Sequence, residues 1–325
     1  MRFKIFDFNI VKCVDKELNR LKPYTKNVRT FILLLASGRI SWFRLPMPDK
    51  LYIKLLYRER TGKKINLNTP VLLNEKLQWL KLYNRKSEYF QYADKYRVRQ
   101  YISDVIGEKY LIPSIGKWDR VEDIDVNSLP EKFVLKCNHN SSDGMVICKD
   151  KSALDWEKAS KAIKRAMKIN YFYLSREWAY KGIKPCIVGE KFLENADGTP
   201  IADYKFYCYG GKPRYFMYSI GEANHQVRNH KFDMNLHSID YLFKEKPTIE
   251  EKEIALPNNI GEMISIVEKL CEGFPHIRID LYNVNGHIYF GEMTFFSGGG
   301  IINIHSDEFA QKMADLIDIS GIRSE

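Results

Sequence analysis

The sequence predicts an α+β protein in which antiparallel sheets have helices alongside them. Two observations lead to this fold class. Many apolar runs are short, alternate in the manner of strands and are bounded by turn residues. Between them lie segments with helical spacing, the clearest of which are residues 74–85 and 258–271. Strands and helices in this arrangement favour an α+β chain with a smaller N-terminal and a larger C-terminal part.

Composition limits the class of protein further. The chain has 325 residues, of which 45% are hydrophobic and 28% charged, as in a globular protein of roughly two domains. Its six cysteines are scattered without a CxxC pair, so neither a disulfide framework nor a zinc site is indicated, and reduced thiols in a cytosol fit best. Neither GxxxxGK[ST] nor GxGxxG occurs, which excludes those two phosphate-binding motifs.

Positive charge is concentrated in residues 1–64, a basic N-terminal arm predicted to be helical. The arm holds 16 Lys/Arg and 5 Asp/Glu, whereas the remaining residues hold 35 and 36. Its apolar run 30–36 is far shorter than the roughly 20 residues of a membrane span, and no convincing signal-peptide cleavage site follows. With Trp42 and Phe43 close by, the arm either lies on an anionic bilayer surface or docks on the protein's own body. It carries no nucleic-acid recognition motif, so no nucleic-acid partner is expected.

Residues 65–130 are predicted to form an N-terminal subdomain. Residues 74–85 have helical spacing, with their first residue, an asparagine, as the cap. Residues 94–106 are predicted to be a second helix, which a glycine ends. A proline and a glycine in residues 113–116 then indicate a loop.

Residues 131–325 are predicted to form the larger C-terminal part. Its predicted strands follow a proline or end at glycines, and a polar loop, residues 138–144, separates the first two. The predicted strands are 133–137, 145–148, 186–193, 203–209 and 214–220, and the predicted helices are 153–169 and 258–271.

A hairpin over residues 278–294 carries two acids, Asp280 on its first strand and Glu292 on its second. With residues 284–286 as a three-residue loop, Asp280 falls opposite Phe290, on the same face as Glu292. Neighbouring carboxylates repel, and a hard cation with oxygen ligands is the usual reason for such a pair. The alternative is an exposed hairpin whose polar residues point outward.

Lys136 ends a predicted strand next to the loop NHNSSDG. Ser141, Ser142 and Gly144 lie in this loop, whose N–H groups, together with a lysine point charge, could hold a phosphate. Taken alone the signal is weak, because lysines in strands usually extend to solvent.

Two further charged pairs lie on predicted strands. Glu190 and Lys191 end an apolar strand, and Asp203 and Lys205 occupy one face of the next. The alternative for the second pair is an ordinary ion pair worth well under about 1 kcal/mol.

The order of these parts resembles the ATP-grasp superfamily over roughly residues 131–304. That family has five parts in a fixed order: a strand lysine, a Ser/Gly loop, an apolar hinge strand with an acid, a second basic residue and a terminal D…E-x-N unit. The resemblance implies the ATP-grasp fold, in which two α+β subdomains clasp a nucleotide, here preceded by a helical N-terminal region. It also implies ATP and Mg²⁺ as cofactors.

The resemblance also implies roles for individual residues. It assigns nucleotide contacts to Lys136, Ser141, Ser142, Gly144, Glu190, Lys191, Leu193 and Asp203, catalytic contacts to Lys205 and Arg278, and metal ligation to Asp280, Glu292 and Thr294. Arg278 matches the R-x-D of D-alanine–D-alanine ligases. Thr294 stands where the family has asparagine, so Glu292 could have to bridge the metal alone. The later SGGG replaces a Pro-Gly turn of the family.

Several segments resemble one branch more closely, the TupA-like ATP-grasp proteins, over about residues 65–304. These segments are LNEKLQWLKLYNR, YADKYRVRQYI, FVLKCNHNS, REWAYKGIKPCIVGEKFL, DYKFYCYGG and RIDLYNVNGHIYFGEMTF. The branch is linked with teichuronopeptide and surface-polysaccharide biosynthesis. The resemblance implies an ATP-dependent ligase joining a sugar-acid carboxylate to an amino acid or other amine, in the cytoplasm and at the inner face of the membrane if the arm binds lipid.

Two alternatives stay open. An ATP-dependent glycan kinase would use Lys136, Asp280 and Glu292 in the same way, but would leave phosphate on the sugar instead of releasing it. A non-catalytic ATP-binding subunit is favoured by Thr294.

Overall fold

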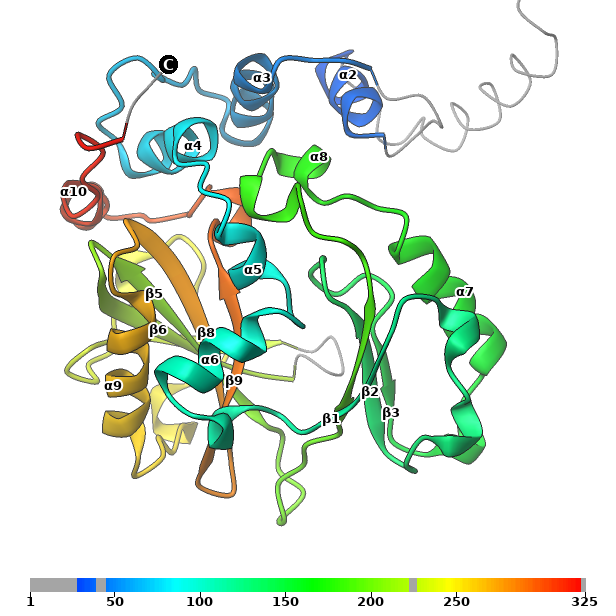
Figure 1. Cartoon of the computed structure of the whole chain (residues 1–325). Coiled ribbons are helices and arrows are strands. Elements are labelled where there is room, and N and C mark those ends of the chain that lie inside the picture. Colours follow the sequence, from blue (N-terminus) through cyan, green and yellow to red (C-terminus); the bar gives the residue numbers. More distant parts are fainter. Residues whose placement is uncertain (1–27, 39–44, 222–226, 323–325) are drawn as a thin grey trace, which may run out of the picture. The chain divides into compact units, whose positions relative to one another are not determined.

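The computed structural model describes residues 28–38, 45–221 and 227–322 (Figure 1). The chain divides into two compact units. The smaller comprises Met1–Asn66 with Tyr173–Arg176, and the larger comprises Leu67–Phe172 with Glu177–Glu325. The predicted boundary between residues 130 and 131 stays a prediction.

In the described residues, the smaller unit contains α2 (Val28–Ser37), α3 (Asp49–Thr61) and most of the short helix α8 (Phe172–Ser175). The apolar run 30–36 of the predicted helical arm lies in α2, whose Leu33 and Ala36 pack in one apolar cluster with α3. Trp42 and Phe43 lie outside the described residues. Among the described helices, none has the length and apolarity needed to cross a membrane.

Arg176 joins its short segment to α3. Its guanidinium lies 3.8 Å from the centre of the Tyr52 ring, and its Nε is 2.9 Å from a carboxylate oxygen of Asp49. The hydroxyl of Tyr52 donates to the carbonyl of Leu174 at 2.9 Å. These contacts explain why four residues from the middle of the chain belong to the N-terminal unit.

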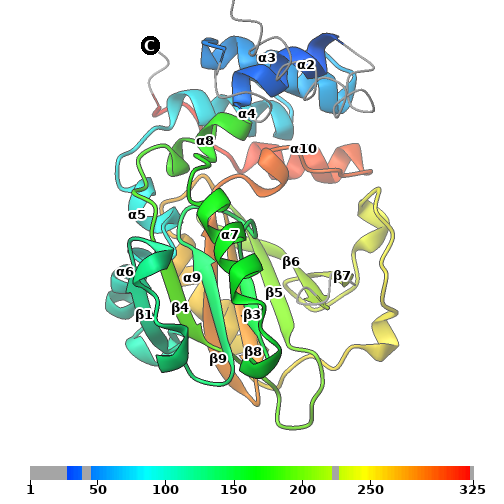
Figure 2. The ribbon, with the colours of Figure 1, turned by 90° about the vertical axis from the view of Figure 1, so that its right-hand side faces the viewer.

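Two antiparallel sheets form the larger unit, as the α+β prediction requires (Figures 1 and 2). The four-stranded sheet has the order β1-β4-β2-β3, with bounds Ser114–Trp118, Ile187–Lys191, Phe133–Cys137 and Val146–Cys148. The five-stranded sheet has the order β7-β6-β5-β8-β9, with bounds Arg228–Asp233, Lys212–Ile220, Ala202–Tyr209, His276–Val284 and His287–Thr294.

Helix α7 (Trp156–Ala166) covers one face of the four-stranded sheet (Figure 1). Strand β2 alternates, and its Phe133 and Leu135 are fully buried in the same core as Ile163 of α7. Because successive side chains of a strand point to opposite faces, Lys136 faces away from this core. The alternation of one short segment thus directs a lysine to the other side of the sheet.

Helix α9 (Ile260–Cys271) packs on the five-stranded sheet through contacts with β6 and β8. The odd and even positions of β5 and β8 differ in chemistry. Phe206 and its partner Ile279 are fully buried, whereas Lys205 and its partner Asp280 lie on the opposite face. The sheet therefore has one apolar face and one face that carries charged residues.

Besides several short 3-10 helices, the described part of the larger unit contains four more α-helices. They are α4 (Leu73–Tyr83), α5 (Tyr89–Ala93), α6 (Val98–Val105) and α10 (Asp307–Asp315). The predicted helix over residues 74–85 corresponds to α4. The predicted helix over 94–106 begins later, at Val98, because the Asp94 carboxylate accepts hydrogen bonds from the N–H groups of Tyr96 and Arg97 in a turn before it.

The predicted loop over residues 113–116 was wrong, because β1 begins there. Gly116 and its partner Gly189 both lie under the Trp118 ring, and a Cβ at either position would approach ring atoms to 2.4 and 2.8 Å. These glycines permit close packing across the strand pair, which local composition does not reveal. Strand β7 and helix α10 were not predicted either.

The predicted register of the acidic hairpin was also wrong. Asp280 pairs with Glu292, not with Phe290, because a bulge lies between Asp280 and Leu281. The loop has two residues, Asn285 and Gly286, both with positive φ (52° and 81°), as a tight hairpin requires. Both acids still lie on one face, since directly paired residues share a face.

His276, at the start of β8, is expected to make the protein sensitive to acid. Burial lowers its pKa to about 4, although its Nδ1 lies 2.9 Å from the carbonyl of Cys208. Between pH 6.5 and 4 the unfolded chain binds a proton that the folded protein does not, so stability falls as the pH is lowered, by roughly 3 kcal/mol across the window. Urea unfolding of the His276→Gln variant should show a flatter pH dependence there, and an unchanged slope would contradict this.

Candidate functional site

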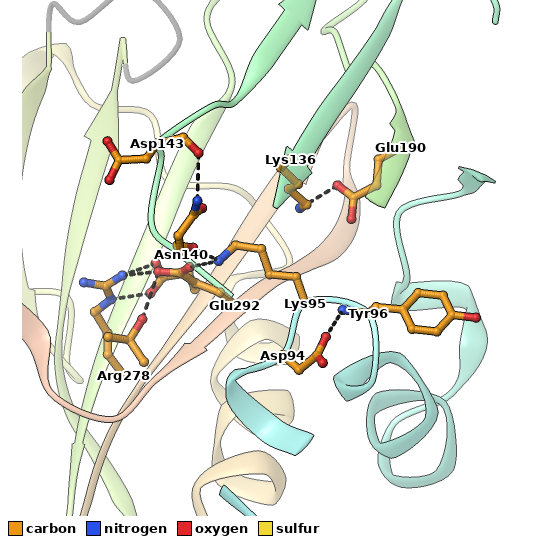
Figure 3. Close-up of polar contacts among 11 residues, drawn as sticks. Asp94, Lys95, Tyr96, Lys136, Asn140, Asp143, Glu190, Arg278 and Glu292 are labelled. Carbon is orange, nitrogen blue, oxygen red and sulfur yellow. Dashed lines mark hydrogen bonds and ion pairs between the residues drawn. The ribbon is translucent and has the colours of Figure 1, made fainter. Parts of the chain in front are cut away.

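Arg278 connects the two acids of the hairpin, Asp280 and Glu292; Figure 3 labels Arg278 and Glu292. Its Nε and Nη2 donate to the two carboxylate oxygens of Asp280, each at 2.6 Å, and Nη2 also donates to Glu292 at 2.6 Å. The register places all three residues on one face, because Arg278 pairs with Thr294 and Asp280 with Glu292. The arginine therefore balances two neighbouring negative charges that would otherwise repel.

Glu292 has two further partners. The hydroxyl of Thr294 donates to its Oε1 at 2.8 Å, and Nζ of Lys95 lies 3.5 Å from its Oε2. Lys95 also donates to the backbone carbonyl of Asn140 in the loop after β2. One lysine from the segment between α5 and α6 thus contacts both the acid pair and this loop (Figure 3).

The two acids differ in their protonation. Burial raises the pKa of Asp280 to about 8, against the opposing charge of Arg278. Burial alone would also raise the pKa of Glu292, but the charges of Lys95 and Arg278 and the Thr294 hydrogen bond lower it to about 2. Glu292 is therefore ionised at neutral pH, whereas burial opposes the ionisation of Asp280 and the charge of Arg278 favours it.

Lys95 itself is almost buried, with its side chain 9% exposed. Burial lowers its pKa, Lys136 adds to the fall, and the Glu292 charge opposes it. The influence of Lys136 on both Lys95 and Glu292 indicates that the lysine of the four-stranded sheet lies close to the acids of the five-stranded sheet.

Lys136 forms an ion pair with Glu190 across strands β2 and β4, at 2.6 Å. Val134 pairs with Glu190 and Lys136 with Val188, so both charged side chains lie on the face that points away from α7. Their side chains are only 15% and 8% exposed, so Lys136 does not extend into solvent. The two charges are available to a polar ligand on this face.

The loop after β2 has a fixed base and an exposed tip. The Asn138 side chain accepts from the N–H of Cys186 at 2.8 Å, and the Asn140 amide donates to the carbonyl of Asp143 at 2.8 Å. Both asparagines are buried, whereas Ser141 and Ser142 are exposed. The two serines are therefore exposed next to a buried, hydrogen-bonded base.

Gly144 lies at the end of this loop, packed against α7. Its φ is +72°, and a Cβ there would come within 2.6 Å of the Ala166 Cβ. A side chain at this position is strained by the backbone and blocked by the helix. Backbone conformation and packing therefore explain why this residue is glycine. They do not test the nucleotide contact that the resemblance implies.

The Gly144→Ala variant is therefore expected to be destabilised. Left-handed backbone and overpacking together should cost about 2 to 4 kcal/mol. Gly198→Ala is the matched control, since Gly198 has nearly the same φ, +73°, but nothing within 4 Å of a Cβ. Chemical unfolding of both variants should show a clearly larger loss at Gly144; equal losses would rule out the clash with α7.

Lys205 and Asp203 form an ion pair at 3.2 Å along one face of β5. Lys205 pairs directly with Asp280 on β8, so the row of charges continues from β9 through β8 to β5. Tyr207, the next residue on this face, pairs with Arg278. Burial raises the pKa of Tyr207, so its hydroxyl stays protonated at neutral pH.

Lys191 and Leu193 lie apart from this row of charges. Lys191 ends β4 opposite Phe133, so its exposed side chain belongs to the other face from Glu190. Its backbone N–H donates to the carbonyl of Pro113. Leu193 follows the strand and is half-buried. The structure thus brings Lys136, Glu190, Asp203, Lys205, Arg278, Asp280, Glu292 and Thr294 to the facing sides of the two sheets, but not the side chain of Lys191.

Helix α4 holds the glycine loop that follows β9. The Gln78 amide donates to the carbonyls of Gly299 and Gly300 at 2.9 Å, and Lys81 donates to Gly299. Both side chains are buried. The glycines permit this, because Gly298, Gly299 and Gly300 all have positive φ.

Sequence reasoning assigned no role to Lys95, Gln78 or Lys81, although it singled out their segments. The available signal was a lysine directly after an acid in YADKYR and polar residues at helical spacing in LNEKLQWLKLY. Neither pattern tells which distant backbone carbonyl these side chains contact.

The oxygen atoms around the acid pair are of the kind that binds Mg²⁺. Asp280 and Glu292 offer carboxylate oxygens and Thr294 a hydroxyl, and Mg²⁺ is commonly held by one or two carboxylates together with substrate phosphates and water. The guanidinium of Arg278 bonds both carboxylates and so offsets part of their negative charge. Within the described part of the chain, no group of three or more His, Cys, Asp or Glu side chains could hold a metal ion.

The family described as TupA-like ATPgrasp matches residues 75–318. No curated protein sequence matches the chain.

Solved structures with some likeness include two D-alanine–D-alanine ligases and a D-cycloserine synthetase. The ligase from Helicobacter pylori is 13% identical, with a TM-score of 0.42, over 76% of this chain and 69% of that chain. The ligase from Bacillus anthracis is 18% identical, with a TM-score of 0.36, over 63% and 57%. The D-cycloserine synthetase DcsG is 12% identical, with a TM-score of 0.38, over 70% and 71%. This chain spans little more than half of the Bacillus anthracis ligase.

Proposed function

Because the chain belongs to the TupA-like ATP-grasp family, we propose that it is an ATP-dependent, ADP-forming ligase that joins a carboxylate to an amine. The observation that supports this best is that Lys95 and Arg278 both contact Glu292, that Arg278 also bonds Asp280, and that the charge of Lys136 helps to lower the pKa of Glu292. Phosphoryl transfer depends chiefly on positioning and on neutralising charge, which such a group of residues supplies.

The proposed reaction has two steps. The substrate carboxylate attacks the γ-phosphorus of ATP, and the bond to the β,γ-bridging oxygen breaks, giving an acyl phosphate and ADP. The amine then attacks the acyl carbon, phosphate leaves, and the amine loses a proton to yield the amide. No protein nucleophile is required.

Individual residues have proposed tasks in these steps. Lys136, with the loop of Ser141, Ser142 and Gly144, would hold phosphates. The hinge strand with Glu190, Lys191 and Leu193 would take the adenine. Asp203 lies beside Lys205 and would keep it oriented toward phosphate. Arg278 would face the reacting acyl oxygen.

Asp280, Glu292 and Thr294 would hold Mg²⁺, which when bound neutralises charge on the phosphates. Arg278 bonds both acids in this structure, so it would have to release Asp280 for the ion to bind. Thr294 stands where the family has asparagine, so Glu292 would be the main ligand on β9. Its side chain contacts Arg278, Thr294 and Lys95.

The substrates that we propose are a sugar acid and an amino acid, joined in the synthesis of a surface polysaccharide. Arg278 and Lys205 on one face are suited to a carboxylate and to phosphate. The hydroxyls of Tyr207, Tyr180 and Tyr282 are available as neutral donors, because burial raises the pKa of each.

ADP release from Mg-ATP, screened over uronic acids paired with amino acids, tests the proposal. A ligase releases ADP and phosphate only when both acceptors are present, and hydroxylamine should trap the acyl phosphate as a hydroxamate. Phosphate retained on the sugar would support the glycan kinase instead. Tight ATP binding in calorimetry without turnover on any acceptor would support the non-catalytic subunit, which Thr294 favours.

Lys136→Met is expected to weaken ATP binding by about tenfold or more, because a buried charge beside the phosphates is lost. Lys132→Met is the matched control: Lys132 directly precedes the same strand but is exposed and paired with Glu194. Calorimetry should separate the two variants. Equal affinities for ATP would remove Lys136 from the nucleotide site.

A further inference from the structure

Helix α3 of the smaller unit presents a continuous basic face. Lys50, Lys54 and Arg58 follow at intervals of four residues, so they lie on one side of the helix, and all three are exposed. Leu51, on the same side, is 47% exposed. The opposite side carries the buried residues Tyr52, Ile53, Leu56 and Tyr57.

The acids of α3 do not neutralise this face. Asp49 is engaged with Arg176 at 2.9 Å, and Glu59 accepts a hydrogen bond from Thr30 at 2.5 Å. Among the described residues, none forms an ion pair with Lys50, Lys54 or Arg58. Two more exposed lysines follow directly after the helix, at positions 63 and 64.

Helix α7 also carries several exposed cations, but acids pair with part of them. Its cations are Lys158, Lys161, Lys164 and Arg165. Lys161 pairs with Glu157 one turn away, and Lys164 pairs with Glu122 at 2.9 Å. On the α3 face, by contrast, none of the three cations has such an acidic partner among the described residues, and all three belong to the basic arm.

We propose that the face of α3 formed by Lys50, Leu51, Lys54 and Arg58 binds the surface of an anionic lipid bilayer. Cations at this spacing with an exposed leucine among them suit a helix that lies in the plane of the headgroups. The apolar run of α2 is a less suitable lipid-facing segment, because its Leu33 and Ala36 are buried in the apolar cluster with α3. The inference does not depend on the proposed ligase chemistry.

Sedimentation of the full chain with phosphatidylcholine vesicles, with and without 30% phosphatidylglycerol, tests this proposal. The protein should bind only the anionic vesicles, and binding should weaken as salt is raised. The triple variant Lys50→Gln, Lys54→Gln, Arg58→Gln should bind roughly a hundredfold more weakly, from the loss of three charges near the surface.

The matched control is Lys158→Gln, Lys161→Gln, Lys164→Gln, which changes net charge by the same amount and should bind like the unmodified protein. The proposal fails if the two triple variants bind alike, or if the unmodified protein binds neutral vesicles equally well or anionic ones not at all. Failure to bind anionic vesicles but retention on an acidic polysaccharide would identify a glycan-binding face instead. ADP release on a soluble acceptor, measured in parallel, should be equal in all three proteins, so failure of the ligase function is recognised separately.

Discussion

Replacing Glu292 with glutamine is expected to lower ADP release by about a thousandfold or more while the protein stays folded. Glu292 is ionised and contacts Arg278, Thr294 and Lys95. Glutamine keeps the size of the side chain but removes the charge that would hold a metal ion. Metal and charge stabilisation of a phosphoryl group is worth several kcal/mol, and each 1.36 kcal/mol changes a rate tenfold.

Asp280→Asn should have a comparable effect, because Asp280 faces Glu292 directly. Glu194→Gln is the control, since this exposed acid pairs only with Lys132 among the ion pairs of the described residues. Thermal unfolding checks that each variant is folded, and a coupled assay measures ADP. Full turnover in both Asp280→Asn and Glu292→Gln would exclude these acids as a metal site.

The second large effect is expected from Arg278→Gln, which should abolish turnover and at the same time tighten Mg²⁺ binding. Arg278 makes three hydrogen bonds of 2.6 Å to the two carboxylates, so it competes with a metal ion for the same oxygens. Without it, the buried Asp280 and the half-buried Glu292 face each other unbalanced, and a divalent cation relieves their repulsion. We expect Mg²⁺ affinity to rise at least tenfold.

Mg²⁺ titration followed by calorimetry, without nucleotide, measures this directly. In EDTA the variant should unfold at a lower temperature than the unmodified protein, and Mg²⁺ should restore more of its stability than it adds to the unmodified protein. Arg228→Gln, at an exposed arginine paired with Glu253, is the control. Weaker Mg²⁺ binding by Arg278→Gln would show that the arginine supports the cation site instead of competing for it.

Much of the fold follows from local patterns. Alternation in FVLKC directs Lys136 away from the core beneath it, and alternation in ADYKFYCY places Asp203 and Lys205 on one face. The match of the TupA-like family over residues 75–318 confirms the family resemblance that the sequence motifs indicated. These features depend on the period of a strand and on neighbouring residues, which the sequence contains directly.

Other features depend on partners far along the chain. Strand β1 contains Gly116 and forms because Gly189 of another strand packs under the same tryptophan, so its composition alone indicated a loop. A bulge after Asp280 sets the register of the acidic hairpin, and spacing alone misplaced it by predicting a longer turn. Edge strands and bulges are decided by pairing, and residue preferences for strands are weak.

The sequence by itself determined the family, the antiparallel α+β character, the basic arm and the face of its strand on which each charged residue lies. Only the tertiary structure decided that Lys95 contacts Glu292, that Arg278 bonds both acids and that the basic face of α3 lacks neutralising partners. Periodicity fixes the direction of a side chain within its own element. Which charges meet depends on how separate elements pack, and that is set by contacts between residues distant in sequence.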